Sequence, residues 1–472
     1  MVFSSTIFIM LFLPLFLMTY YAVPNKYRSY IILLGSYIFY AWWRVDFLLL
    51  FFGVTLFNHI VSKQMIARPR NKKLFMIIGV AGNLLTLGYF KYFNFGVDSL
   101  NSLLGYSDQA PLTLWSVILP IGISFYIFQA ISYIIDVYRG DASPPDRFVD
   151  FAAFIALFPQ LIAGPVLRYK DVVDQFTSRT HTWEKFNEGA TRFAIGFSKK
   201  IFIADTLAPL ADASFALQDP TMVEAWIGIL AYTAQLYFDF SGYSDMAIGL
   251  GLMMGFRFIE NFNQPYISRS ITEFWQRWHI SLSTWLRDYL YIPLGGNRKG
   301  KARTYFNLII TMILGGLWHG ANWTFVVWGA LHGAIMAFER FMGSKNKKTP
   351  YPALIALPLT FLFVIIGWVF FRSENITKAF GMLKGMAGMN DIGFSNEILW
   401  SITNLQIATL VAAYVIIFTS PMIVGEKKPL NNTQSWTSAL STPHKLLFMI
   451  VMVLGLFKLI SSSFSPFLYF QF

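Results

Sequence analysis

The chain has 472 residues, of which 55% are hydrophobic, 18% aromatic and only 13% charged, and its mean hydropathy is +0.51. Soluble domains carry about 25% charged residues, so this composition excludes an ordinary soluble protein. The chain has no cysteine, which excludes disulfides, thiolate metal sites and an acyl-cysteine intermediate. The net charge is +12, but the basic residues cluster in short loops beside apolar runs. This is the positive-inside pattern of a membrane protein, not a nucleic-acid-binding surface.

Apolar runs of about 20 residues recur along the chain and predict an all-α, polytopic integral membrane protein. The first run, 5–23, lacks a basic leader and a small-residue cleavage site, so we interpret it as a retained span. Two further spans, 30–42 and 47–61, lead to the densest basic loop of the amino-terminal half, 63–73. The positive-inside rule places that loop in the cytoplasm and the amino terminus in the periplasm.

The middle of the chain departs from simple spans. Segment 148–167 is apolar but interrupted by Pro159, Gly164 and Pro165, which predicts a bent or re-entrant element packed inside protein. Segment 196–213 is apolar but carries Lys199, Lys200 and Asp205, and is either a span or an interfacial helix.

Segment 222–258 is long enough for a tilted span with extra turns, and it places Gln235 and Asp239 on one helical face. A carboxylate within a membrane span, such as that of Asp239, faces protein or water and not lipid. Two alternatives stay open for Asp239: a hydrogen bond to a neighbouring helix, or a direct part in a site.

Segment 270–333 is the predicted functional core. We expect 270–290 to be one amphipathic helix, with a polar stripe through Arg277 and Asp288 and an apolar stripe through Trp275 and His279. A basic, cytoplasmic loop at 298–303 follows. Segments 305–317 and 323–341 predict a helical hairpin, whose turn holds the sequence Trp-His-Gly-Ala-Asn at 318–322.

Three more spans, at 353–371, 405–424 and 446–460, complete the prediction. Together the segments amount to about ten to twelve crossings, with re-entrant and interfacial pieces, in a single membrane domain over 1–472. The tail after 460 is then periplasmic.

His319 is the strongest candidate for chemistry. It is flanked by Gly315, Gly316 and Gly320, which allow close backbone approach, and by Trp318 and Trp323, which we expect to form rigid walls. A neutral imidazole can take a proton from an attacking hydroxyl, and a thioester donor needs no metal for such a transfer. From the residues alone, a purely structural, hydrogen-bonded role for His319 is an equal alternative.

The other histidines are weaker candidates. Packing is the leading interpretation for His279, because its predicted stripe is apolar. His332 lies 13 residues after His319 and would not share its face on a continuous helix, so we interpret it as a structural or lining residue. No metal site is predicted, because no HExxH spacing or tight acidic and histidine cluster occurs.

Six segments resemble the membrane-bound O-acyltransferase family, in the branch that serves exopolysaccharide O-acetylation. They are 120–141, 158–169, 235–266, 273–296 with its Arg-Trp-His element, 314–333 with its Trp-His-Gly element, and the tail 465–472. The resemblance covers essentially the whole chain and implies a ring of tilted helices around a thinned centre.

The resemblance also assigns roles. His319 matches the catalytic histidine of the family, and His279 matches a second core histidine of bacterial members. Side chains expected to line or support a substrate tunnel are Trp318, Asn322, Trp323, Trp278, Arg287, Asp288 and Asp239. Acetyl-coenzyme A is the implied cytoplasmic donor, with no bound cofactor.

The implied place of action is the bacterial inner membrane, in contact with membrane lipid. The acetyl group would pass to a periplasmic acetyltransferase partner that modifies a polymer, alginate in particular. Two alternatives stay open: a transporter or export component without acyl chemistry, and the same fold with another acceptor, such as a cell-wall polymer or a lipid.

Overall fold

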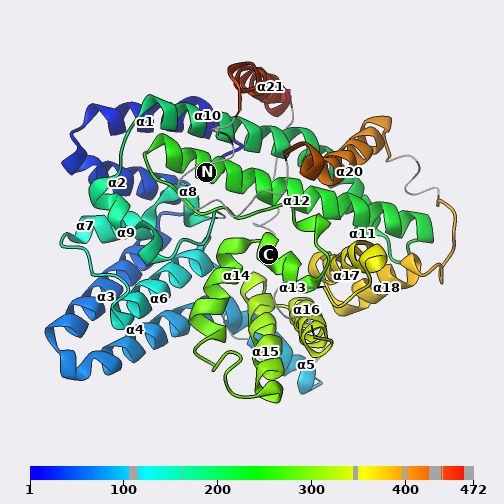
Figure 1. The fold of residues 1–472 in the computed structure, drawn as a ribbon, viewed down its shortest axis with the longest axis horizontal. Coiled ribbons are helices and arrows are strands. Elements are labelled where there is room, and N and C mark those ends of the chain that lie inside the picture. The colour runs from blue at the N-terminus through cyan, green and yellow to red at the C-terminus, as the bar shows by residue number, and fades with distance from the viewer. Residues whose placement is uncertain are drawn as a thin grey trace. The chain divides into compact units, whose positions relative to one another are not determined.

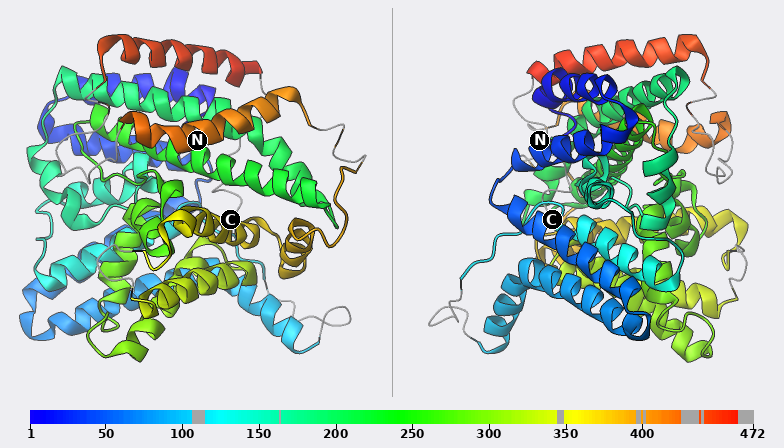
Figure 2. Two further views of the ribbon diagram at one scale, coloured as in Figure 1. Left: turned by 45° about the vertical axis from the view of Figure 1, so that its right-hand side comes forward. Right: turned by 90° about the vertical axis from the view of Figure 1, so that its left-hand side faces the viewer.

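The computed structural model describes residues 1–105, 115–162, 164–343, 349–395, 399, 402–424, 437 and 440–461. Within these ranges the regular structure is helical and no strand occurs. The chain forms two compact units. Figures 1 and 2 show its helices, coloured by residue number from blue to red. The first unit comprises Met1–Asn187 and Leu250–Phe258, and the second comprises Glu188–Gly249 and Ile259–Phe472.

The first unit is built from apolar helices and a few short ones. In chain order they are η1 (Phe8–Phe12), α1 (Leu13–Ala22), η2 (Asn25–Tyr27), α2 (Arg28–Ala41), α3 (Phe47–Ala67), η3 (Pro69–Asn71), α4 (Lys72–Leu87), η4 (Gly88–Tyr92), α5 (Phe93–Leu103), α6 (Ile123–Arg139), α7 (Phe148–Ala156), α8 (Phe158–Leu161) and α9 (Tyr169–Ser178). Helix α10 (Trp183–Ser198) begins in this unit and continues into the second.

The second unit carries the predicted core. Its helices are η5 (Lys199–Ala204), α11 (Asp205–Ala216), α12 (Met222–Met253), η6 (Pro265–Ile267), α13 (Ile271–Arg277), α14 (Ile280–Leu286), η7 (Arg287–Tyr291), α15 (Lys301–His319), α16 (Trp323–Phe341), α17 (Ala353–Arg372), α18 (Ile376–Met386), α20 (Asn404–Val424) and α21 (Thr442–Ser461). The last four residues of α12 belong to the first unit.

Helices α3 and α4 illustrate how apolar helices associate here, and they run side by side in Figure 1. Leu49 of α3 is 80% exposed, as a lipid-facing side chain would be, whereas Asn58 is fully buried. Asn58 and Asn83 of α4 exchange amide hydrogen bonds of 3.1 and 2.7 Å. Reciprocal amide pairing is a typical polar contact between helices that have apolar surroundings.

Four helical segments are long and apolar enough to cross a membrane: Phe47–Ala67, Pro69–Leu103, Ala353–Arg372 and Thr442–Ser461. Two shorter apolar helices, Phe8–Ala22 and Asn404–Ser420, accompany them among the described residues. The total of about ten to twelve crossings therefore stays a prediction, as do the sides of the termini. The tail 465–472 lies outside the described residues.

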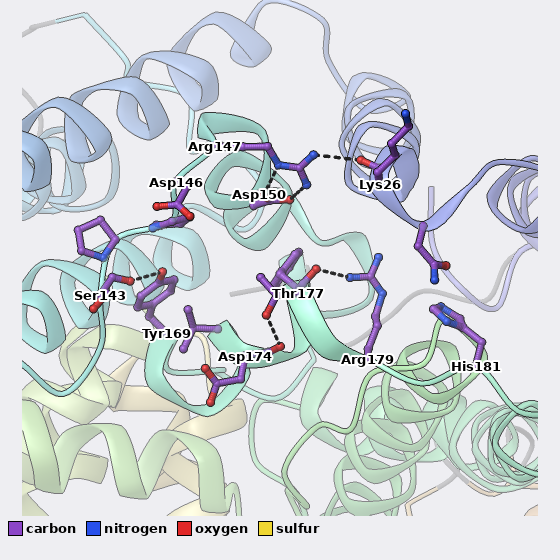
Figure 3. A pocket seen from close by; sticks show the side chains of 15 residues that line it. Lys26, Ser143, Asp146, Arg147, Asp150, Tyr169, Asp174, Thr177, Arg179 and His181 are labelled. Atoms are coloured by element: carbon purple, nitrogen blue, oxygen red, sulfur yellow. Dashed lines mark hydrogen bonds and ion pairs between the residues drawn. The ribbon is translucent and has the colours of Figure 1, made fainter.

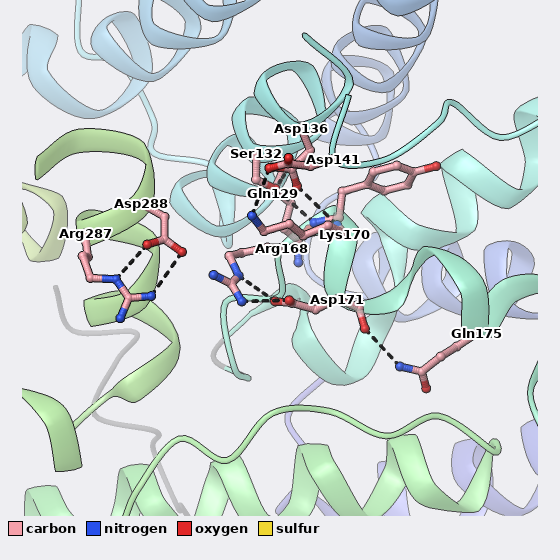
Figure 4. A network of polar contacts seen from close by, with 11 residues as sticks. Gln129, Ser132, Asp136, Asp141, Arg168, Lys170, Asp171, Gln175, Arg287 and Asp288 are labelled. Carbon is pink, nitrogen blue, oxygen red and sulfur yellow. Dashed lines mark hydrogen bonds and ion pairs between the residues drawn. The ribbon is translucent and has the colours of Figure 1, made fainter. Parts of the chain in front are cut away.

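The interruption predicted within 148–167 is confirmed. Helix α7 ends at Ala156, α8 covers only four residues, and the chain is not helical from 164 to 168. The next helix, α9, begins where Arg168 makes two hydrogen bonds of 2.7 and 2.8 Å to Asp171 (Figure 4). Asp171 lies in the first turn of α9, where a carboxylate also interacts favourably with the helix dipole.

Candidate active site

The chain breaks at His279, so the single helix expected over 270–290 is wrong. Helix α13 ends at Arg277, Trp278 is extended, and His279 adopts the left-handed conformation at φ 44° and ψ 53° before α14 begins at Ile280. This conformation is strained for a side chain with a Cβ, at a cost of about 1 kcal/mol or more. Buried contacts around His279 must hold it in place.

Asn261 provides those contacts. Its backbone carbonyl accepts from the Ile280 amide at 3.0 Å, and its side-chain oxygen accepts from Ser281 N at 3.3 Å and from Ser281 Oγ at 2.8 Å. The same oxygen lies 3.1 Å from His279 Nδ1. Because the backbone amide of Ser281 can only donate, the Asn261 atom facing it is the oxygen.

The Asn261 contact sets the tautomer of His279. An amide oxygen accepts only, so Nδ1 of His279 carries the proton and Nε2 of the neutral ring is an acceptor. The His279 side chain is fully buried, and its Nε2 has no hydrogen-bond partner among the described residues. The ring therefore presents one free lone pair in the interior of the second unit.

His319 lies beside His279. It is the last residue of α15, is 4% exposed, and its ring centroid lies 6.3 Å from that of His279. Trp318, Trp328 and Phe371 pack against its ring at centroid distances of 5.0, 5.2 and 5.1 Å. Two imidazoles from separate helical segments thus meet within an aromatic enclosure.

The predicted hairpin is confirmed and accounts for the position of His319. Helices α15 and α16 pack along their length (Figure 1), and the turn at 320–322 joins them. A Cβ on Gly329 would lie 2.4 Å from the Met312 carbonyl oxygen, and one on Gly316 would lie 2.2 Å from that of Phe325. Only glycine at these two positions permits so close an approach of the backbones.

Trp328 lies between His332 and His319. The centroid of its ring is 5.0 Å from that of His332 and 5.2 Å from that of His319. His332 is fully buried, and its Nδ1 accepts from Trp275 Nε1 at 3.3 Å. This contact agrees with the structural role predicted for it. Trp328 itself was missed by sequence reasoning, although it lies on the same helix as His332.

The predicted supporting residues fall into different places. Asn322 caps α16 by accepting from Thr324 N at 3.0 Å and donates to the Glu374 carbonyl at 2.8 Å. Trp278 is buried, with Phe262 and Trp368 each at a centroid distance of 5.0 Å. Trp323 is 55% exposed, and its place in the wall of a substrate tunnel stays a prediction.

Arg287 and Asp288 form an ion pair with each other, with Arg287 Nε 2.7 Å from Asp288 Oδ1 (Figure 4). Arg287 is 60% exposed and Asp288 14%. Glu273 and Arg277, four residues apart on α13, form a further ion pair at 2.8 Å.

Asp239 is placed by an ion pair. It lies 2.9 Å from Lys200 and is 1% exposed, which favours the structural alternative left open by the sequence. Nearby, Arg192 bridges Asp245 at 2.8 Å and Glu260 at 2.5 Å, and Lys199 pairs with Asp245 at 2.6 Å.

This ion network leads to the histidines. Glu260 directly precedes Asn261, and the Asn261 amide donates to Ser244 Oγ of α12 at 3.0 Å. A cavity of about 160 Å³ is lined by Arg192, Lys199, Asn261 and their neighbours. The network thus fixes the segment that orients His279.

Glu339 fixes the start of α13, at the end of this helix that lies away from the break, and sequence reasoning missed it. Its fully buried carboxylate accepts from Ile271 N at 2.6 Å, Thr272 N at 3.0 Å and Thr272 Oγ1 at 2.6 Å. It therefore satisfies the free amides at the start of α13 from helix α16. A charged residue in an otherwise apolar helix was the signal available.

Within the described ranges, no group of three or more His, Asp or Glu side chains is arranged to hold a metal ion. The groups in position for chemistry are the two imidazoles.

Comparison with known proteins places this site in a family. The sequence profile described as MBOAT, membrane-bound O-acyltransferase family, matches residues 143–376. Over the full length of both chains, the sequence is 55% identical to the probable alginate O-acetylase AlgI of Pseudomonas putida and 52% identical to that of Pseudomonas aeruginosa. The chain belongs to the membrane-bound O-acyltransferase family. It is an O-acetyltransferase with the membrane character of that family.

A more distant relative has a different printed acceptor. The peptidoglycan O-acetyltransferase of Helicobacter pylori is 34% identical over all of this chain and 98% of its own length. The matched family segment contains Asn261, His279, His319 and Glu339. The residues around the two imidazoles therefore all lie in the part of the chain that defines the family.

Proposed function

We propose that this chain takes an acetyl group from acetyl-coenzyme A at the cytoplasmic face and passes it across the inner membrane for O-acetylation of an exopolysaccharide. The observation that carries the proposal is the pair of buried imidazoles, His279 and His319, whose ring centroids lie 6.3 Å apart. Full-length similarity to probable alginate O-acetylases makes alginate the proposed polymer.

The proposed chemistry needs a base, a thioester donor and an acceptor hydroxyl. His319 takes the proton of an attacking hydroxyl as its oxygen forms a bond to the thioester carbonyl carbon. The C–S bond then breaks, and the departing thiolate receives that proton from the His319 imidazolium. The acetyl group ends as an ester on the hydroxyl oxygen, and free coenzyme A leaves.

In this scheme His279 positions the reacting groups. Asn261 holds the Nδ1 proton, so Nε2 accepts a hydrogen bond from a hydroxyl placed between the two rings. The aromatic enclosure of Trp318, Trp328 and Phe371 excludes water, which would otherwise hydrolyse the thioester.

The proposal includes a topology and a partner. The basic loops face the cytoplasm, both termini face the periplasm, and about ten to twelve crossings surround the site. A periplasmic acetyltransferase takes the acetyl group to the polymer. Four apolar spans and the basic loop around Arg70 support this arrangement.

Cellular complementation tests the proposal. In a strain that lacks this protein, His319→Ala should abolish polymer acetylation while the protein still inserts into the membrane at normal levels. His444→Ala is the matched control, because His444 is exposed on α21 and should restore wild-type acetylation. Normal acetyl content with a well-expressed His319→Ala protein would refute the role of His319.

A second candidate acceptor is a cell-wall polymer, which the 34% identity to a peptidoglycan O-acetyltransferase favours. Acetyl analysis of both polymers in the same strains separates the two. Family membership favours either acceptor over a transporter without acyl chemistry.

A further inference from the structure

Two arginines and a histidine surround one tyrosine at the end of α1, in the first unit. The guanidinium carbons of Arg28 and Arg179 lie 4.9 and 6.0 Å from the centre of the Tyr20 ring. Arg179 Nε donates to the Tyr20 hydroxyl at 3.0 Å, and His181 Nε2 lies 2.9 Å from the same oxygen. Three cationic or titratable groups therefore share a single aromatic side chain.

The Tyr20 hydroxyl cannot neutralise them. It donates its one proton to the Met254 carbonyl at 2.8 Å, so its oxygen accepts from both Arg179 and His181. Its contribution is a neutral acceptor and not a negative charge.

Arg28 is buried without a counter-ion. Its side chain is 9% exposed, and its Nε and Nη1 atoms have no hydrogen-bond partner among the described residues. Neither Arg28 nor Arg179 makes an ion pair with any described carboxylate. A buried, uncompensated guanidinium is costly, and a second one beside it adds repulsion. An anion next to both guanidinium groups would reduce both the cost of their burial and the repulsion between them.

A cavity of about 640 Å³ opens beside this cluster (Figure 3). Arg179 and His181 lie at one end with Lys26, whereas Asp146 and Ser143 lie at the opposite end. In the same wall, Arg147 and Asp150 already neutralise each other in an ion pair of 2.8 Å. The cationic end thus has space for a polar headgroup next to unneutralised charge.

The cluster lies at the border of the apolar surface. Leu15 and Met18 of α1 are 54% and 70% exposed, as lipid-facing residues are, and Tyr21, Tyr27 and Tyr30 follow with 39–51% exposure. Exposed tyrosines next to an apolar helix mark the headgroup level of a bilayer. The Arg28 guanidinium lies 5.4 Å from the Tyr21 ring and therefore belongs to the same level.

We propose that Arg28, Arg179 and His181 form a binding site for the phosphate group of an anionic phospholipid. Arg179 and His181, which line the cavity, bind the phosphate oxygens, and Arg28, which packs on the Tyr20 and Tyr21 rings, adds positive charge to the site. Lys26 and the cavity accommodate the rest of the headgroup. The site is independent of acetyl transfer and lies on residues that the active site does not use.

Native mass spectrometry of the delipidated full-length protein tests the site. Added phosphatidylglycerol should be retained at one molecule per chain in preference to phosphatidylcholine. Arg28→Gln and Arg179→Gln should each weaken this retention about tenfold or more, because each removes a positive charge from the site. Arg70→Gln, which removes an exposed charge from the basic loop of the same unit, should leave retention unchanged.

The controls separate folding and ligand source. Arg179 is partly exposed, so Arg179→Gln tests the site even where Arg28→Gln fails to fold, as judged by circular dichroism and gel filtration. Inorganic phosphate serves as the soluble competitor. Displacement of the lipid by millimolar phosphate, with the same dependence on both arginines, keeps the anion site and overturns the lipid assignment. Equal loss in Arg70→Gln, or no preference for the anionic lipid, overturns the site itself.

Discussion

Two buried arginines of this protein have opposite surroundings. Arg192 is 1% exposed in the second unit and contacts two carboxylates, Asp245 and Glu260. Arg28 is 9% exposed in the first unit and has no carboxylate partner among the described residues. Buried charge that is neutralised within the chain supports structure, here the segment that orients His279. Buried charge that is left unneutralised is available to a ligand.

The largest effect expected from this difference concerns stability. Arg192→Met leaves Glu260 without its cation and Asp245 with Lys199 alone, and should lower the free energy of unfolding by about 3–5 kcal/mol. Arg28→Met removes an uncompensated charge and should lower it by less than about 1 kcal/mol, or raise it, in protein free of anionic lipid. Thermal unfolding of both variants in a neutral detergent measures the difference. Equal destabilisation by Arg192→Met and Arg28→Met would contradict the difference drawn between the two arginines.

The next effect concerns the link from the ion network to catalysis. Asn261→Ala removes the acceptor that holds the Nδ1 proton of His279, so kcat should fall about tenfold or more with little change in KM. Asn261→Asp keeps an acceptor oxygen in the same place and should recover part of the loss. Steady-state kinetics with acetyl-coenzyme A check this. A purely structural role for Asn261 predicts instead that both variants lose folded protein and that the remainder turns over normally.

The smallest effect concerns His181. Burial and the neighbouring Arg28 and Arg179 lower the pKa of His181 to about 4, although a hydrogen bond to the Met254 carbonyl opposes the shift. Lys185 adds to the positive surroundings. The folded chain therefore binds a proton at His181 less readily than the unfolded chain, in which the pKa of His181 has its ordinary value of about 6.5. His181 contributes stability that is complete above that pH and is lost as the pH falls toward 4.

The pH dependence can be measured directly. The melting temperature of the wild type should decline between pH 6.5 and pH 4, and His181→Gln should flatten part of that decline. Saturation with phosphatidylglycerol should also flatten it, because a bound phosphate favours the protonated ring. An unchanged slope in His181→Gln would remove His181 from the cationic cluster.

Local signals were sufficient for some elements. The hairpin of α15 and α16 was predicted because two apolar runs flank a glycine-rich turn, and the break in 148–167 because Pro159, Gly164 and Pro165 disfavour one continuous helix. Both depend on neighbouring residues along the chain.

The break at His279 could not be predicted in this way. The hydrophobic periodicity runs through 270–290 without a proline or glycine near Trp278. The helix is interrupted by partners distant in sequence: the Asn263 amide donates to the Arg277 carbonyl before the break, and Asn261 contacts His279 and Ile280 at the break and just after it. Trp328 was missed for the same reason, since only the packing of α16 brings its ring against His319.

The most direct test of the proposed chemistry is turnover of acetyl-coenzyme A by the purified full-length protein in lipid, followed as release of free coenzyme A. Wild type and His444→Ala should release coenzyme A at the same rate when an acceptor hydroxyl is supplied. His319→Ala, folded and inserted to the same extent, should fall to the uncatalysed rate. Full turnover by His319→Ala would contradict the account.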